Sequence, residues 1–275
     1  MPWELTADVE AFVATAGDFL RSRPVQHTVM LTLVGTLRRR GLHAYGPGDP
    51  VFGFWRPDQS VEAVLIQTPP YPMMFSAMPA AAVPEAVEAV ADRPLTGVNM
   101  LADTVDEFVA GWHERTGATT TVKMRTRLYL LDTLPPPARQ IGQSRVAAAA
   151  DRDLLLRWHE AFYDEIGERS PGGIVDDRLG YGGVVLWEVD GVPVSVAEFS
   201  RVEAGMSRVQ MVYTPKEFRG RGYAGGATTV ATRAAIDQGA EAVVLNTDLA
   251  NPTSNGLYQR LGYRPVEDRT VVEFW

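Results

Sequence analysis

The order of hydrophobic and polar positions predicts a similar succession of elements twice along the chain. In the first half, apolar residues recur with helical spacing over residues 4–22 and 27–40, and short runs rich in β-branched and aromatic residues follow. We expect strands at 51–55, 61–67, 73–78, 97–101 and 120–131, and helices at about 83–94 and 105–115. Asp103 or Thr104 is the expected cap of the latter helix and Gly117 its end.

The second half repeats this succession. We expect strands at 143–148, 183–188, 192–200, 209–214, 242–246 and 265–274, and helices at 151–168, 222–237 and 254–261. Asp151 is the expected N-cap of the first of these helices, and Asp190-Gly191 predicts a tight hairpin turn. The stiff stretch Leu134-Pro135-Pro136-Pro137 separates the halves, so we expect domains at residues 1–134 and 139–275.

The most informative stretch joins the strand at Val209 to the helix after it. Pro215 removes a backbone donor, so the strand should end near Thr214, and the chain then reads Arg219-Gly220-Arg221-Gly222-Tyr223-Ala224. The first N–H groups of a helix lack intrahelical acceptors and carry the positive end of the helix dipole, so a phosphate can bind there. The glycines allow close approach to the backbone, and Arg219 and Arg221 add positive charge.

The same turn also fits two other interpretations. From Gly220 to Gly225 it reads GxGxxG, the fingerprint of a dinucleotide-binding Rossmann fold, which would predict an NAD-dependent oxidoreductase. That fold expects the fingerprint after its first strand, with several βα units downstream, and the chain ends at residue 275. The other interpretation is a surface turn of arginine and glycine that binds no ligand.

Two motifs together indicate a family. Arg219, Gly222 and Ala224 fill the pattern Arg/Gln-x-x-Gly-x-Gly/Ala, and residues 242–266 read as a strand, a loop, a short helix and a Gly-aromatic exit. They resemble motifs A and B of the GCN5-related N-acetyltransferase (GNAT) superfamily. The resemblance is close over residues 145–275 and only architectural over residues 1–135. It implies an α/β (α+β) fold of tandem GNAT-like domains, each a mixed, mostly antiparallel sheet flanked by helices.

The resemblance implies acetyl-CoA as co-substrate, bound where the fourth and fifth strands of the second domain diverge. Its pantetheine arm would meet the backbone of Met211, Val212 and Tyr213 and the side chains of Asn251 and Ser254, although Asn251-Pro252 also makes an ordinary turn. Its phosphates would bind along Arg219, Gly220, Arg221, Gly222, Tyr223 and Ala224, mostly to backbone N–H groups. At the matching place the first half reads Pro79-Ala80-Ala81-Ala82-Val83-Pro84, so we expect a degenerate copy serving the acceptor pocket or oligomerisation.

Tyr258 is the expected general acid, because a phenol with an ordinary pKa near 10 can protonate the thiolate that an attacking amine expels. The base that deprotonates the amine is open between Glu198, Asp248, a chain of water molecules and a residue of the first domain. Alternation places Glu198 beside Val194 and Val196 on one strand face, an unusual position for a carboxylate unless it is paired or used. His159 we expect to serve packing or to lie on the surface.

Composition narrows the remaining classes. The chain has no cysteine, which excludes disulfides and a thiolate nucleophile, and its histidines show no metal-ligand spacing. A net charge of −8 argues against a nucleic-acid binder. No apolar run reaches the roughly 18 residues of a membrane span and the N-terminus lacks a signal pattern, so we expect a cytoplasmic protein that does not bind membranes.

The sequence therefore predicts an acetyl-CoA-dependent N-acetyltransferase that acts by direct attack in a ternary complex. Its acceptor would be a small-molecule or peptide amine, and the protein could form a homodimer. The alternative in another class is a non-catalytic acyl-CoA sensor or interaction module with the same phosphate-binding turn.

Overall fold

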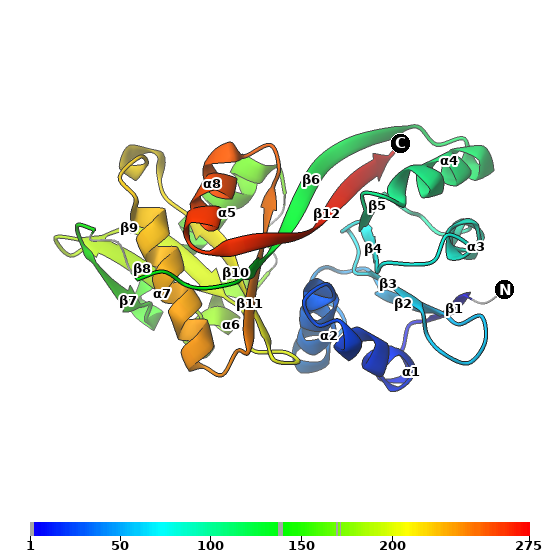
Figure 1. The fold of residues 1–275 in the computed structure, drawn as a ribbon, viewed down its shortest axis with the longest axis horizontal. Helices are drawn as coiled ribbons and strands as arrows, with labels where there is room; N and C mark the ends of the chain where they lie inside the picture. The colour runs from blue at the N-terminus through cyan, green and yellow to red at the C-terminus, as the bar shows by residue number, and fades with distance from the viewer. Residues whose placement is uncertain (1–2, 137–139, 169, 171) are drawn as a thin grey trace. The chain divides into compact units, whose positions relative to one another are not determined.

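The computed structural model describes residues 3–136, 140–168, 170 and 172–275 (Figure 1). They form two compact units. Unit 1 holds the chain up to Leu128 together with Thr247–Asn251 and Val266–Trp275, whereas unit 2 holds Tyr129–Asn246 and Pro252–Pro265. Pro137 of the expected linker and the expected domain start at residue 139 lie outside the described residues.

Unit 1 is a sheet with helices on both faces. Its strands β1, β2, β3, β4, β5 and the C-terminal part of β12 lie in this order; β4 and β5 pair in parallel, and the other pairs of this run are antiparallel. Apolar side chains pack against α1 and α2 on one face and against α3 and α4 on the other. The elements are β1 (Trp3–Thr6), α1 (Val9–Ser22), α2 (Thr28–Arg40), β2 (Val51–Trp55), β3 (Ala63–Gln67), β4 (Met73–Phe75), α3 (Ala82–Val90), β5 (Gly97–Leu101), α4 (Val105–Thr116) and β6 (Thr120–Leu131).

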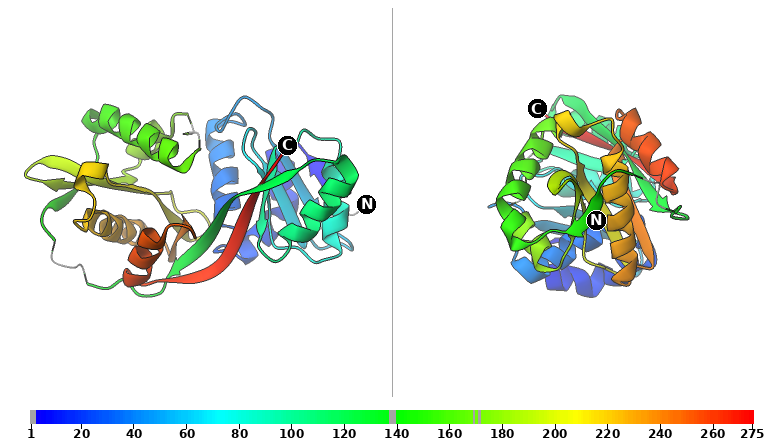
Figure 2. Two further views of the ribbon diagram at one scale, coloured as in Figure 1. Left: turned by 90° about the horizontal axis from the view of Figure 1, so that it is seen from above. Right: turned by 90° about the vertical axis from the view of Figure 1, so that its left-hand side faces the viewer.

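Unit 2 has the same kind of architecture. Its strands lie in the order β11, β10, β9, β8, β7, and only β10 and β11 pair in parallel. Figure 2 shows α5 on one side of this sheet and α7 and α8 on the other, as the two apolar clusters of the unit also require. The elements are β7 (Gln143–Val146), α5 (Arg152–Ile166), α6 (Ile174–Gly180), β8 (Val184–Val189), β9 (Val192–Phe199), β10 (Met206–Tyr213), α7 (Tyr223–Asp237), β11 (Ala242–Asp248), α8 (Pro252–Arg260) and β12 (Tyr263–Phe274).

The two units repeat one topology. In unit 1 an antiparallel run ends at β4, and α3 crosses to the parallel strand β5; in unit 2 the corresponding run ends at β10, and α7 crosses to β11. The mixed, mostly antiparallel sheets flanked by helices confirm the predicted fold class. The hairpin turn at Asp190-Gly191 is also confirmed, with both residues at positive φ, 52° and 78°.

The last strand is shared between the units. β12 begins in unit 2, but from Val266 onward it belongs to unit 1, where its residues Arg269 to Glu273 pair with β5. Phe274 stacks on Trp112 of α4, with ring centroids 5.4 Å apart. The units therefore do not divide at a single point of the chain, and the domain limits expected at residues 134 and 139 stay a prediction.

One expectation at an element end is wrong, and one helix was missed. The chain begins with strand β1, and helix α1 starts only after Asp8, whose carboxylate accepts from the N–H groups of Glu10 and Ala11 at 2.8 and 3.2 Å. Helix α6 was not predicted, because its seven residues span only about two turns, too few to establish a helical pattern. Thr104 and Asp151 are the N-caps of α4 and α5, as expected, although neither side chain bonds to the first N–H groups of its helix.

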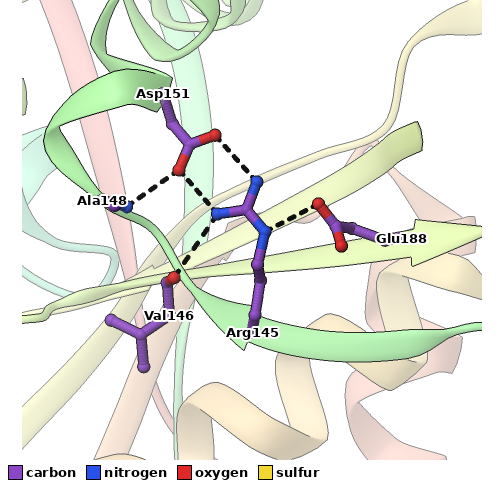
Figure 3. A network of polar contacts seen from close by, with 5 residues as sticks. All are labelled: Arg145, Val146, Ala148, Asp151 and Glu188. Carbon is purple, nitrogen blue, oxygen red and sulfur yellow. Dashed lines mark hydrogen bonds and ion pairs between the residues drawn. The ribbon is translucent and has the colours of Figure 1, made fainter. Parts of the chain in front are cut away.

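Asp151 instead joins a network that fastens the edge strand β7 (Figure 3). Its carboxylate accepts from Arg145 at 2.6 and 2.8 Å and from the N–H of Ala148 at 2.8 Å. The Nε of Arg145 donates to Glu188 of β8 at 2.7 Å. One guanidinium thus joins the carboxylates of Asp151 and Glu188, whose side chains are 12% and 10% exposed.

We expect Arg145→Met to lower the free energy of unfolding by about 1–2 kcal/mol at pH 7, because two partly buried carboxylates lose their cation. The Arg145 guanidinium holds the pKa of Asp151 below its ordinary value. The stability that the ion pair of Arg145 with Asp151 contributes is therefore fully present above the unfolded-state pKa of Asp151, about 3.9. It is lost as the pH falls through the lower folded-state pKa of Asp151. Urea denaturation at pH 7 and pH 3 should show the difference between wild type and variant shrinking. Arg157→Met, at an exposed position of α5, is the control.

Candidate active site

The glycine-rich turn has the predicted backbone. β10 ends at Tyr213, Pro215 follows, and α7 begins at Tyr223 inside the motif, as expected. Gly220 and Gly222 both have left-handed backbone conformations, with φ of 75° and 83°. Gly222 is the N-cap of α7. The turn therefore needs glycine at these positions for backbone reasons alone.

The turn presents a row of backbone N–H groups at the start of α7. Among the residues that the structure describes, no acceptor meets the N–H groups of Gly220, Arg221, Gly222, Tyr223 and Ala224. The next N–H groups, of Gly225 and Gly226, already bond to the carbonyl of Gly222 at 2.9 and 3.3 Å. Since this row coincides with the positive end of the helix dipole, it suits an anion such as a diphosphate.

The glycines after the turn serve packing. A Cβ on Gly226 would come within 2.8 Å of the Trp187 ring and 2.3 Å of the Gln140 side chain, and one on Gly225 within 3.3 Å of Leu257. The missing side chain of Gly226 therefore lets α7 lie close to Trp187 of β8, and that of Gly225 lets it lie close to Leu257 of α8. The interpretation of the GxGxxG sequence as a Rossmann fingerprint is wrong. A Rossmann fold has a mostly parallel sheet, whereas the strands of unit 2 pair mainly antiparallel.

The side chain of Arg219 is held by protein groups. Its Nη2 lies 2.8 and 2.7 Å from the carboxylate oxygens of Glu165 on α5, and its Nε donates to the carbonyl of Thr214 at 2.8 Å. Its guanidinium also lies 5.8 Å from the ring centre of Tyr213. Arg219 thus ties the turn to the last turn of α5, and its charge is balanced by Glu165. Arg221 is exposed.

The strand that leads into the turn carries a β-bulge. Gln210 pairs with Glu198 and Tyr213 with Val196, so Met211 and Val212 together oppose one residue of β9. Met211 has a φ of 47°. The parallel pairing of β10 with β11 stops at Val209 and Leu245, so the two strands diverge just where the bulge begins. This leaves backbone groups of Met211, Val212 and Tyr213 without a neighbouring strand on the β11 side.

Glu198 is fully enclosed. Its side chain is 1% exposed, its Oε1 lies 2.5 Å from His159 Nε2, and its Oε2 lies 3.1 Å from Arg178 Nε. His159, on α5, is buried, which agrees with the expectation that it serves packing. It also contacts the carboxylate of Glu198. Arg178 was missed by the sequence analysis, because it lies on the unpredicted helix α6. A carboxylate in a strand of buried apolar residues was the signal that a cation had to be near.

The expectation that Val194 and Val196 share a face with Glu198 is confirmed for Val196 and wrong for Val194. The register between β8 and β9 shifts between Trp187 and Glu188, so the alternation is interrupted. Val196 packs with residues of α5, as Glu198 does, whereas Val194 packs with residues of α7 on the other face.

Tyr258 lies on α8 among aromatic residues. Its side chain is 8% exposed, and its ring meets that of Tyr263 edge to face at 6.3 Å. Burial raises the pKa of Tyr258 to about 12, so the phenol keeps its proton at neutral pH. The hydroxyl of Tyr263 forms a hydrogen bond with Thr232 Oγ1 at 2.7 Å. Tyr258 is therefore protonated at neutral pH, as a general acid must be.

Asp248 and Asn251 lie in the turn between β11 and α8. The Asp248 carboxylate accepts from the N–H of Ala250 at 2.9 Å, and the N–H of Asn251 donates to the carbonyl of Asp248 at 3.1 Å. Both residues are grouped with unit 1, where the N–H of Leu249 donates to the carbonyl of Arg125 at 2.8 Å. Ser254 follows on α8. Their expected contacts with the co-substrate stay predictions.

Two classes of site are not seen in the described part of the chain. Residues 3–136, 140–168, 170 and 172–275 contain no cluster of histidine, aspartate and glutamate suited to a metal ion. Over the same residues, no helix combines the length and the apolar character that crossing a membrane requires.

Comparison with known proteins agrees with this geometry. Residues 148–263 match the model of the acetyltransferase (GNAT) family, and no curated protein matches the chain. A solved Drosophila protein matches with a TM-score of 0.72 and 12% identity, covering 100% of this chain and 98% of that one. A GCN5-related N-acetyltransferase from Kribbella flavida matches at TM-score 0.57 and 22% identity, covering 77% and 86%.

A tandem GNAT protein of the clavulanic acid biosynthesis pathway also matches, at TM-score 0.55 and 13% identity, covering 99% of this chain and 98% of that one. The fold of this chain is therefore similar to that of a tandem GNAT protein, and residues 148–263 are a domain of the acetyltransferase (GNAT) family.

Proposed function

We propose that this chain is an N-acyltransferase that moves an acyl group, most simply acetyl, from coenzyme A to an amine by direct attack in a ternary complex. The family of residues 148–263 supports acyl transfer in general. The observation that carries the proposal is the row of N–H groups from Gly220 to Ala224, which meet no acceptor among the described residues and which follow a strand that diverges from its parallel neighbour.

The residues present fit acyl-CoA. The N–H groups of Gly220 to Ala224 would hold its diphosphate, with the exposed Arg221 adding charge and Arg219 fixing the turn through Glu165. The backbone of Met211, Val212 and Tyr213, on the side where β11 no longer pairs with β10, would hold the pantetheine arm, together with Asn251 and Ser254. The carbonyl of Tyr213 already accepts from Ser195 Oγ at 3.0 Å. No residue of the turn is an acid that would repel the phosphates.

The bound acyl-CoA supplies a thioester carbonyl that an amine can attack, with coenzyme A as leaving group. The chain supplies proton transfer. Tyr258 holds a proton on its Oη and gives it to the departing sulfur. Burial would also raise the pKa of a thiol formed beside Tyr258, which reduces the difference between the pKa values of the two groups.

The amine must lose a proton before or during attack. Glu198 can act as base only through His159 or after Arg178 moves, since both of its oxygens are already engaged. Asp248, a chain of water molecules and a residue of unit 1 are the other sources of this base. The acceptor we propose is a small-molecule or peptide amine, handled by a cytoplasmic protein that can form a homodimer.

Gly222→Val is expected to weaken binding of coenzyme A at least about tenfold, since a β-branched residue at positive φ costs roughly 1–3 kcal/mol and distorts the N–H row. Isothermal titration calorimetry measures the dissociation constant. Gly239→Val is the matched control, because Gly239 also has positive φ, 93°, and open space around it, but lies beyond the other end of α7. Equal affinities of the two variants would contradict the proposed site.

Release of free thiol from acetyl-CoA over a panel of amines then tests catalysis. Turnover with an amine supports the transferase. Tight binding without turnover on any amine would support the alternative, an acyl-CoA sensor, and a thermal shift with NAD instead of coenzyme A would contradict both.

A further inference from the structure

The two units differ at one equivalent point, where the parallel strands part. In unit 2 the pairing of β10 with β11 ends at Val209 and Leu245, and the strands diverge beside a β-bulge. In unit 1 the pairing of β4 with β5 ends at Met74 and Asn99, and β4 has no bulge against β3. At both places the two parallel strands no longer pair with each other.

In unit 1 a guanidinium fills this place. Arg269, on β12, donates from Nη2 to the carbonyl of Phe75 at 2.5 Å and to the carbonyl of Asn99 at 3.0 Å. Its Nε donates to the Asn99 side-chain oxygen at 2.8 Å. Phe75 ends β4 and Asn99 belongs to β5, so one side chain bridges the two strands.

Arg269 is held there as a buried charge. Its side chain is 10% exposed, and Glu267, at 3.4 Å from Nη1 and 15% exposed, supplies the neighbouring negative charge. Burial lowers the pKa of Arg269 and raises that of Glu267. A buried cation is retained only where hydrogen bonds compensate its desolvation, and the carbonyls of Phe75 and Asn99 provide that compensation.

The turn after β4 differs as well. The N–H groups of Ala82 and Val83 donate to the carbonyls of Pro79 and Ala80 at 2.9 and 3.1 Å, and the flanking prolines Pro79 and Pro84 have no N–H. The start of α3 therefore offers an anion far fewer amide donors than the start of α7.

We propose that the Arg269 guanidinium occupies the place in unit 1 where β4 and β5 diverge. Acyl-CoA then cannot bind there, and the chain binds a single acyl-CoA, in unit 2. This rests on the proposed function for the location of the one open site. Unit 1 then has a role other than co-substrate binding. The side chain that occupies its strand divergence comes from β12, the last strand of the chain.

Titration calorimetry of the full chain with coenzyme A tests the stoichiometry. We expect one equivalent per chain, and we expect Gly222→Val to weaken that whole signal. Two equivalents, or a second site of unchanged affinity in Gly222→Val, would overturn the inference while leaving the proposed function intact. The absence of any binding would overturn the proposed function, and the melting experiment below would then decide the role of Arg269.

Arg269→Met removes the bridging donors and should lower the melting temperature by about 5 °C or more, with coenzyme A affinity changed less than about twofold. Arg269→Lys, which keeps a charged donor, should recover part of that loss. Arg264→Met is the control on the same strand, at a side chain 59% exposed, and should melt close to wild type. Equal melting temperatures of Arg269→Met and Arg264→Met would contradict the bridging role.

Discussion

Replacing Tyr258 by phenylalanine is expected to lower kcat roughly 10²-fold, with little change in affinity for coenzyme A. The substitution removes only the hydroxyl, and the buried ring, 8% exposed, keeps its contact with Tyr263. The loss should therefore come from the missing proton donor and not from the fold. Thiol release under saturating acetyl-CoA measures kcat.

The pH profile gives a second test of the same role. Because burial raises the pKa of Tyr258 to about 12, its acid form persists over the whole neutral and mildly alkaline range. The acid is lost only as the pH rises through that raised value. We therefore expect kcat of the wild type to show no alkaline decline caused by Tyr258 below about pH 11.

Tyr263→Phe is the matched control, since Tyr263 also lies buried in unit 2 but already bonds to Thr232 through its hydroxyl. That variant should lose about 1 kcal/mol of stability and keep its kcat. Unchanged turnover in Tyr258→Phe would remove the general-acid role. Equal losses in both variants would indicate a disturbed core instead.

The second large effect is expected at Glu198. Glu198→Leu should lower the free energy of unfolding by about 3–5 kcal/mol, because it removes the carboxylate that lies 3.1 Å from the buried Arg178 guanidinium and that contacts His159. Urea denaturation measures this loss. Glu160→Gln, at an exposed position on the same helix as His159, should change stability by less than about 0.5 kcal/mol.

The double variant Glu198→Leu with Arg178→Met separates stability from chemistry. Replacing a buried ion pair by apolar residues of similar size is often neutral or stabilising, so the double variant should regain most of the lost stability. If Glu198 is the base, it stays inactive across the amine panel despite its restored fold. If activity returns with stability, Glu198 is structural and Asp248 or a chain of water molecules becomes the better base.

The predictions at Tyr258 and at Glu198 differ in how far the sequence alone supports them. Tyr258 follows from a motif of contiguous residues on one short helix. Glu198 stood out only as a carboxylate in an apolar strand, and its partners His159 and Arg178 come from two helices, one of them too short to predict. Contacts between separate elements leave no periodic signal in either of them.

The sequence by itself determined most element types and the glycine turn. Gly220, Gly222 and the start of α7 follow from local rules: which residues tolerate positive φ, and which N–H groups a new helix leaves unbonded. Such rules act within a few residues, so they can be read without knowing the fold.

Only the tertiary structure decided the rest. The irregular register between β8 and β9 places Val194 and Glu198 on opposite faces, Glu165 takes the charge of Arg219, and β12 leaves unit 2 to bring Arg269 between β4 and β5. Each of these outcomes depends on pairing between residues far apart in the chain. A strand carries the same alternation whichever neighbour it pairs with, so its partner is fixed only when the whole sheet assembles.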